Sequence, residues 1–443
     1  MNTKTSTTDQ EKKELGRMTL LTLLIILMLA FLGFGCEDKC EEFRSYVIQD
    51  PVYETTAALR DQVEFIAPEE IHLPGKIYLL GQYLFINEVG KGIHVIDNLD
   101  PARPTPLGFI NIPGNYDMAG KGEFLYADSY VDLVVFDISN IDNIREVNRV
   151  GGVFENYYSA YGYFDSSVGV LVDYEERLIE EFVETNCGFN GWGSDDSFAS
   201  ADTGPLRQAQ VSFLNASTPT SAGVGGSMAR FTVSGDNLYT VDLSTLRTFD
   251  ISDIDDPVAG VTNEITWGVE TIFPYEDKLF LGAQNGMHIF SVSNPNSPTF
   301  LSTYEHITSC DPVVVQDDIA YVTLRGGTEC NGFTNQLEVI DVANPSHPQL
   351  LEVYPMLNPH GLGIDGSCLF VCEGEFGLKM FDAEDITTIG QNLTEHFEGF
   401  HAYDVIPLDG LLMLIGNDGL YQYTYDCEVG EIQQLSAIPI LPL

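Results

Sequence analysis

The stretch QLEVIDVANPSHP, residues 336–348, joins an apolar strand ending in an aspartate to a turn of the form Asn-x-x-Pro. Segments of this form recur as GIHVIDNLDPARP (92–104), DLVVFDISNIDN (132–143), TLRTFDISDIDDP (245–257), GMHIFSVSNPNSP (286–298), GLKMFDAEDI (377–386) and GLYQYTYDCEVG (419–430). Neighbouring copies lie 40 to 50 residues apart, except for a gap of 113 residues between Asp137 and Asp250. Seven copies are visible, and the gap leaves room for a degenerate eighth between Phe154 and Gly225.

Each unit is predicted to contain four short strands: an inner strand, an apolar second strand, the signature strand that ends in Asp, and an outer strand after the turn. The two middle strands are apolar on both faces, which indicates sheets covered on both sides. Four-stranded sheets at this period stack radially in a β-propeller. The sequence therefore predicts an all-β protein with eight four-stranded blades. The alternative is a seven-bladed ring in which the degenerate third unit is an insertion.

The third unit is the weakest part of this prediction. Its expected strands are VGVLVDY (168–174) and RQAQVSFL (207–214), separated by a stretch that includes a Gly/Ser/Asp-rich insertion at residues 187–204. Only TAALRDQV (56–63), ahead of the first unit, looks helical.

The signature strands resemble those of the LVIVD-repeat family, bacterial extracytoplasmic propellers named for a strand like LVVFD or LEVID here. The resemblance runs from about Lys76 to Leu441, with Ser291 and Thr424 replacing the Asp in two copies. It implies a propeller fold and an exported location, and most members lack a defined activity. The recurrent Asp itself is best explained as a turn residue whose carboxylate accepts backbone N–H groups.

The N-terminus is predicted to be an export signal. A basic flank precedes the apolar run of residues 18–34, which spans only about 25 Å as a helix and is short for a membrane span. The following Gly35-Cys36 resembles a bacterial lipobox, although Gly33 stands where Leu is usual, so Cys36 is the expected lipidation site. The acidic residues after Cys36 resemble the surface-export signal of Bacteroidota lipoproteins. The alternative is an uncleaved apolar anchor.

These features divide the chain into a signal peptide (1–35), a linker with a short helix (36–72) and a β-propeller (73–443) with the insertion at 187–204. The expected location is the outer membrane, through the lipid anchor and on the cell surface.

The charge is strongly acidic, with 20 Lys and Arg against 66 Asp and Glu and a net charge of −46. Such a surface repels phosphate backbones and anionic lipid headgroups, which excludes nucleic acid as a partner. Cations, neutral glycans and protein surfaces remain.

The eight cysteines fit an oxidising compartment, and seven remain if Cys36 carries lipid, so at least one has no partner within the chain. Cys310 and Cys330 lie in one predicted hairpin region and are the expected disulfide. Cys368 and Cys372 share a predicted strand, about 13 Å apart, which is too far for a bridge between them. We interpret both as packed thiols rather than zinc ligands.

No nucleophile, zinc or phosphate-binding motif stands out, and the prediction is a protein that is not an enzyme. Aligning the units places a polar residue on each inner strand, facing the central channel: Lys76, Asp117, Arg230, Glu270, Asp311, His360 and Asp404. One hypothesis is that this ring binds a small ligand or a cation through its carboxylates. The favoured interpretation is that Lys76/Asp117 and Arg230/Glu270 neutralise one another around a solvated channel.

The insertion also carries Asp195, Asp196 and Asp202, which could chelate calcium, although a surface loop is the preferred interpretation. No other cofactor is expected. The predicted function is a non-enzymatic platform that binds outer-membrane or envelope proteins, as an accessory subunit of an outer-membrane complex. The alternative is a glycan-binding or glycan-cleaving propeller that uses channel carboxylates.

Overall fold

The computed structural model describes residues 16–18, 20–24, 26, 39–186, 222–265, 268–306, 312–327 and 334–440. The chain forms two compact units, residues 1–52 with 173–203 and residues 53–172 with 204–443. Within the described ranges, no helix combines the length and the apolar character needed to cross a membrane.

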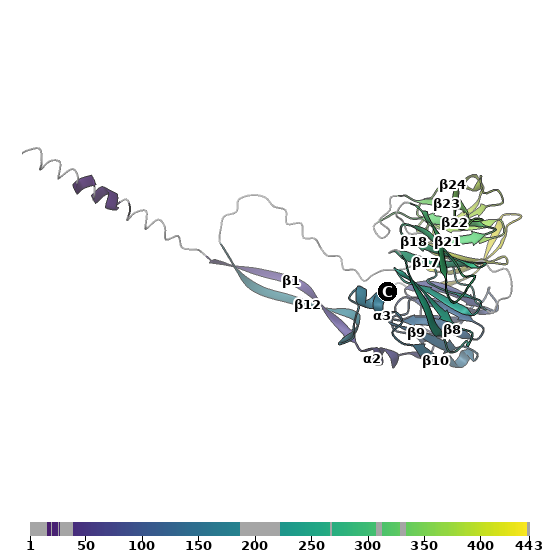
Figure 1. The fold of residues 1–443 in the computed structure, drawn as a ribbon, viewed down its shortest axis with the longest axis horizontal. Coiled ribbons are helices and arrows are strands. Elements are labelled where there is room, and N and C mark those ends of the chain that lie inside the picture. The colour runs from purple at the N-terminus through teal and green to yellow at the C-terminus, as the bar shows by residue number, and fades with distance from the viewer. Residues whose placement is uncertain are drawn as a thin grey trace, which may run out of the picture. The chain divides into compact units, whose positions relative to one another are not determined.

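The larger unit is a β-propeller whose blades are antiparallel sheets numbered in chain order (Figure 1). Blade 1 contains β3 (Pro74–Leu80), β4 (Tyr83–Glu88), β5 (Gly92–Asp97) and β6 (Thr105–Asn111), with β2 (Glu64–Ile66) added outside β6; blade 2 contains β7 (Met118–Lys121), β8 (Phe124–Ser129), β9 (Asp132–Asp137) and β10 (Arg145–Val150); blade 3 contains β13 (Phe231–Ser234), β14 (Asn237–Val241), β15 (Thr245–Asp250) and β16 (Val258–Glu264).

The remaining four blades follow the same order without interruption. Blade 4 contains β17 (Val269–Tyr275), β18 (Lys278–Ala283), β19 (Gly286–Ser291) and β20 (Thr299–Glu305); blade 5 contains β21 (Val313–Gln316), β22 (Ile319–Leu324), β23 (Gln336–Asp341) and β24 (Gln349–Pro355); blade 6 contains β25 (Leu362–Asp365), β26 (Cys368–Cys372), β27 (Leu378–Asp382) and β28 (Leu393–Phe397); blade 7 contains β29 (Asp404–Leu408), β30 (Leu411–Ile415), β31 (Gly419–Asp426) and β32 (Glu431–Pro439).

Blade 7 packs directly against blade 1, which closes the ring. Asn98 and Gln422 exchange two side-chain hydrogen bonds of 2.9 and 2.8 Å, and Ser436 Oγ donates to Pro101 O at 2.6 Å. The two blades also share one hydrophobic cluster, in which Leu84 packs with Met413 and its neighbours. The described residues therefore form a ring of seven blades.

The prediction of an all-β propeller is confirmed, and the blade number is the alternative value of seven. The eighth sheet is three-stranded, in the order β1 (Lys39–Glu54), β12 (Gly169–Asn186) and β11 (Phe164–Asp165), and it is not a blade. The expected strand 168–174 is the beginning of β12, and its partner 207–214 lies outside the described residues. The apolar strand that begins at Gly169 has the composition of a blade strand, but it pairs with the N-terminal strand β1.

The pairing of β12 with β1 also changes the interpretation of the N-terminal region. The expected linker 36–72 contains β1, the short helix α2 (Thr56–Arg60) and β2. The helix lies within the predicted range 56–63, and Thr55 caps it by accepting the N–H of Ala58 on Oγ1 at 3.2 Å. A second short helix, α3 (Glu155–Ala160), was not predicted, so the expectation of a single helix is wrong. The signal peptide and Cys36 lie outside the described residues, except for a few positions between 16 and 26.

The signature aspartates act as turn residues, as predicted. In five blades Oδ1 of the last signature-strand Asp accepts the N–H two residues on, at 2.9 to 3.0 Å: Asp97, Asp137, Asp250, Asp341 and Asp382. In blade 4, Ser291 Oγ accepts the N–H of Ser293 at 3.2 Å. The serine therefore preserves the turn that the aspartate forms elsewhere.

The apolar middle strands are buried on both faces, as stacked blades require. In β8 and β9 the consecutive residues Leu125–Ala127 and Leu133–Val135 have no exposed surface. Because successive strand residues point to opposite faces, this burial means that each sheet is covered on both sides by its neighbours.

One disulfide joins blades 6 and 7. Cys368, the first residue of β26, bonds to Cys427 directly after β31, with 5.4 Å between their Cα atoms. The interpretation of Cys368 as a packed thiol is therefore wrong, while Cys372 is a buried free thiol. The pairing partner lies 59 residues away in the next blade, and strand spacing carries no information about it. Cys310 and Cys330 lie outside the described residues.

Candidate functional site

Residues 222–230 run through the centre of the propeller, and we call them the axial segment. Leu79 of β3 and Val224 exchange backbone hydrogen bonds of 2.7 and 2.6 Å, and Gly223 N–H donates to Gly120 O at 3.0 Å. The N–H of Leu362 at the start of β25 donates to Ser227 Oγ at 3.1 Å. The segment thus contacts the inner strands of blades 1, 2 and 6.

Glycines let the axial segment approach the wall of the channel. A Cβ built on Gly223 would lie 2.3 Å from the Tyr78 ring, and one on Gly225 would lie 2.9 Å from it. The following Ser227 and Met228 are buried, with 0% and 4% of their surface exposed. The expectation of a solvated channel is therefore wrong where this segment passes. The chain fills that space itself.

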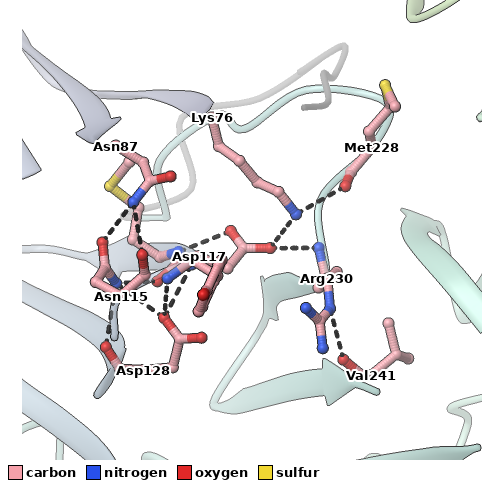
Figure 2. A network of polar contacts seen from close by, with 10 residues as sticks. Lys76, Asn87, Asn115, Asp117, Asp128, Met228, Arg230 and Val241 are labelled. Carbon is pink, nitrogen blue, oxygen red and sulfur yellow. Dashed lines mark hydrogen bonds and ion pairs between the residues drawn. The ribbon is translucent and has the colours of Figure 1, made fainter. Parts of the chain in front are cut away.

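The ion pair Lys76–Asp117 locks the axial segment to blades 1 and 2 (Figure 2). Lys76 Nζ lies 2.7 Å from Asp117 Oδ2 and donates to Met228 O at 3.1 Å. The N–H of Arg230 donates to the same Oδ2 at 2.6 Å. Both charged residues are buried, at 5% and 2% exposure. Burial lowers the pKa of Lys76, and Arg230 adds to this, while Asp117 opposes it.

A chain of hydrogen bonds from Asn87 through Asn115 to Asp128 holds the backbone of Asp117 in place. Asn87 Nδ2 donates to Asn115 Oδ1 at 2.7 Å, and Asn115 Nδ2 donates to Asp128 Oδ1 at 2.9 Å (Figure 2). The N–H groups of Tyr116 and Asp117 donate to the same Oδ1 at 2.7 and 2.9 Å. Burial nevertheless raises the pKa of Asp128 to about 6, against the lowering effect of these backbone donors.

The other predicted ring positions are placed separately. Glu270 accepts a hydrogen bond from Gln284 Nε2 at 2.9 Å, and burial raises its pKa. Arg230 extends its guanidinium toward the Tyr157 ring, 5.9 Å from the centroid, and acts on Glu270 electrostatically. Asp311 lies outside the described residues. Of the two predicted neutralising pairs, Lys76 and Asp117 therefore form an ion pair, whereas Arg230 and Glu270 interact only through the electrostatic effect described above.

Asp404 and His360 are buried polar groups, with 0% and 4% of their surface exposed. The Asp404 carboxyl accepts the N–H of Val405 at 3.0 Å, and its Oδ2 has no hydrogen-bond partner in the described part of the chain. Burial raises the pKa of Asp404 well above its ordinary value. Burial likewise lowers the pKa of His360, with Arg325 and His401 adding to the effect. Both shifts act in the direction of the neutral form, which costs less to bury than the ion.

The arrangement is that of a packed structural network. In the described ranges, no cluster of three or more His, Cys, Asp or Glu side chains is placed to hold a metal ion. The acidic insertion with Asp195, Asp196 and Asp202 lies outside those ranges. Sequence reasoning found Lys76 and Asp117 but missed Asn115, Asp128 and the axial segment. The signal for the last was the small-residue run AGVGGSMAR at 222–230.

One apolar cavity of about 240 Å³ lies where blade 1 meets blade 7. It is lined by Pro68, Glu69, Glu70, Ile71, His94, Ile96, Pro106, Gly108, Ile438 and Pro439. The imidazole of His94 is held by Glu88, with 3.1 Å between Nε2 and Oε2.

The comparisons with known proteins agree with the repeat architecture. Residues 116–151, 275–306 and 311–355 match the family model described as LVIVD repeat. These segments fall on blades 2, 4 and 5, so the chain is a β-propeller that carries LVIVD repeats. The comparison with curated protein sequences gave no match.

Solved propeller-like structures are similar at low sequence identity. The computationally designed Ika8 protein has 10% identity and a TM-score of 0.47, covering 84% of this chain and 89% of its own. Kluyveromyces lactis Hsv2 has 9% identity and a TM-score of 0.46, covering 83% and 99%. PorZ, a surface component of the type-IX secretion system of Porphyromonas gingivalis, has 10% identity and a TM-score of 0.45, covering 86% of this chain and 39% of PorZ.

Proposed function

We propose that this protein is a lipid-anchored outer-membrane propeller that serves as a non-enzymatic platform for binding other envelope proteins. The observation that carries the proposal is an apolar outer rim on blades 3 to 6. The strands β16, β20, β24 and β28 each end their sheet and expose large apolar side chains: Val258, Val261, Phe300, Leu350, Leu351, Val353 and Leu393. We call these residues the rim.

Edge strands present backbone N–H and C=O groups to a further strand, and exposed apolar patches favour association. The chain shows this mode of pairing in blade 1, where β2 adds to β6 with Phe65 opposite Ile110. On the same edge, the Phe65 ring packs over Gly108, which has no side chain to obstruct it. An outer strand of this propeller therefore accepts an added strand.

Blade 5 offers the most receptive edge. Its outer strand β24 reads QLLEVYP and exposes three aliphatic residues without any Lys or Arg. By contrast, the outer strand β10 of blade 2 reads REVNRV and carries the charged residues that commonly protect an edge. The platform is therefore expected to bind through blades 3 to 6, with blade 5 at its centre.

The location in this proposal rests on Gly35-Cys36 and the acidic residues that follow. A lipid on Cys36 would confine the propeller to the membrane surface and raise its effective concentration toward proteins of that surface. The net charge of −46 favours partners with basic surfaces.

The test is affinity purification of the full chain from solubilised outer membrane, followed by quantitative mass spectrometry. The double variant Leu350→Lys/Val353→Lys charges the rim, and Leu99→Lys, at a 73% exposed loop position of blade 1, is the matched control. We expect the control to retain a reproducible partner and the rim variant to lose at least about ten-fold of it, a loss of about 1.4 kcal/mol. Equal recovery by both variants, with both folded, would contradict the proposal.

A further inference from the structure

The smaller unit contains a two-stranded arm formed by residues 39–52 of β1 and 173–186 of β12. Its cross-strand contacts fix which side chains share a face. The rings of Phe43 and Phe182 lie 5.3 Å apart. Tyr46 Oη donates to Glu181 Oε1 at 3.2 Å, and the Arg177 guanidinium forms two hydrogen bonds to Asp50.

Strand alternation then gathers the most exposed apolar side chains of the arm on one face. Phe43 and Val47 are four residues apart on β1, and Tyr174, Leu178 and Phe182 follow the same spacing on β12. Because side chains two apart share a face, each set lies on one side, and the Phe43–Phe182 contact joins the two sets. The opposite face carries the two polar pairs, including Tyr46, together with four partly buried aliphatic residues, Ile48, Val52, Ile179 and Val183. The five residues of the first face are 47 to 70% exposed, and we call this the apolar face of the arm.

Among the residues that the structure describes, no second layer covers this face, and its five side chains stay exposed. An isolated hairpin is at best marginally stable in water, and three or more strands or a packed neighbour are needed for independent stability. The strands here are 16 and 18 residues long, well beyond the usual length. This much exposed aromatic and aliphatic surface is typical of an interaction site.

The charges on the arm define what can cover it. Its described acidic side chains outnumber the basic ones by seven to two: Glu41, Asp50, Asp173, Glu175, Glu176, Glu180 and Glu181 against Arg44 and Arg177. Glu176 and Glu180 alternate with Tyr174, Leu178 and Phe182, so they lie on the apolar face itself. Like charges disfavour a second copy of the arm and an anionic lipid surface.

We propose that the apolar face of the arm is a docking surface for a partner protein whose own surface combines apolar side chains with Lys or Arg. The partner's apolar groups would cover Phe43, Leu178 and Phe182, and its cations would pair with Glu176 and Glu180. This inference rests on the proposed platform function and adds a second contact to the rim.

The test uses the full chain in its own membrane, with the photo-crosslinking residue benzoylphenylalanine at position 182 as the probe. The same residue at exposed Glu175, on the opposite face, is the matched control. We expect a discrete adduct at 182 and none at 175, and the crosslinked peptide of the partner should contain Lys or Arg beside apolar residues. Raising NaCl from about 50 to 500 mM should reduce its yield several-fold.

Two double variants test the apolar and the electrostatic contributions to partner binding separately. Phe43→Ser/Leu178→Ser removes apolar surface, and Glu176→Lys/Glu180→Lys reverses charge while keeping the apolar residues. Each should lower the yield of the 182 adduct at least about ten-fold, a loss of about 1.4 kcal/mol. Because the charge variant leaves the strand pairing intact, it keeps the test valid if the first variant unfolds the arm.

Several results would overturn the inference: no adduct at 182, an equal adduct at 175, an adduct only to lipid or to a second copy, or a yield that the charge reversal leaves unchanged. If the rim variant still loses its partner in these cases, the platform function stands and only the arm inference fails. If neither the rim nor the arm variants alter recovery, both fail.

Discussion

Replacing Lys76 by Met should destabilise the propeller strongly, because it removes one partner of a buried ion pair. The side chain is 5% exposed and its Nζ lies 2.7 Å from Asp117 Oδ2. Without it, the buried Asp117 carboxylate would retain only the backbone N–H groups of Met118 and Arg230. Breaking a buried pair in this way typically costs about 3 to 5 kcal/mol. We expect a loss of about 4 kcal/mol in unfolding free energy.

The double variant Lys76→Met/Asp117→Asn should recover most of this loss, since it buries no unpaired charge. Urea unfolding followed by circular dichroism on both single variants and the double variant gives the coupling energy, which we expect to exceed about 1.5 kcal/mol. Hydrogen exchange supplies a local readout: the N–H of Arg230 should lose protection in Lys76→Met, because the pair holds the axial segment. A coupling near zero with unchanged exchange at residues 222–230 would refute the assignment of the pair as the lock.

Three further predictions concern separate parts of the molecule. Burial raises the pKa of Asp128 from 3.8 to about 6, so ionising this carboxyl destabilises the folded protein. This destabilisation is absent below about pH 4, grows between pH 4 and 6 and is complete above pH 6, where it reaches about 3 kcal/mol at 1.36 kcal/mol per pKa unit. Asp128→Asn keeps the accepting Oδ1, so in urea titrations its stability advantage over the native chain should grow from about pH 4 and be complete above pH 6. An advantage independent of pH would contradict this prediction. Cys427→Ser opens the Cys368–Cys427 link, which spans 59 residues, and should lower the unfolding free energy by about 4 kcal/mol, while a stability unaffected by both the variant and reductant would argue against the bond. Cys36→Ser should move the protein from the membrane to the soluble fraction, and full retention in the membrane would exclude Cys36 as the sole anchor.

Much of the fold follows from local pattern. The signature strands, their turns and the apolar second strands repeat within each unit, so pairing between sequence neighbours was enough to predict the blades. The turn role of Asp97 and its counterparts was predictable for the same reason, since the carboxylate acts on the N–H two residues away. Features that depend on contacts across the ring could not be predicted in this way, because no local sequence pattern specifies them.

The preferred blade number of eight and the solvated channel were wrong, while the alternative of seven blades was correct, because both features depend on the segment between blades 2 and 3. The apolar strand at 169–174 has the composition of a blade strand, yet it pairs with β1, more than one hundred residues earlier. The axial segment, residues 222–230, then passes through the centre of the propeller, where it contacts and buries Lys76 and Asp117. The register of repeats placed these two residues on inner strands correctly. It gave no information on what fills the space between them.

The most direct measurement of the platform function is crosslinking in intact cells from position 350 of the rim, compared with position 99 of blade 1. We expect benzoylphenylalanine at 350, a 47% exposed position, to yield one dominant adduct with another envelope protein, whereas the more exposed position 99, at 73%, should yield none. Absence of an adduct at 350, or the same adducts at both positions, would contradict it.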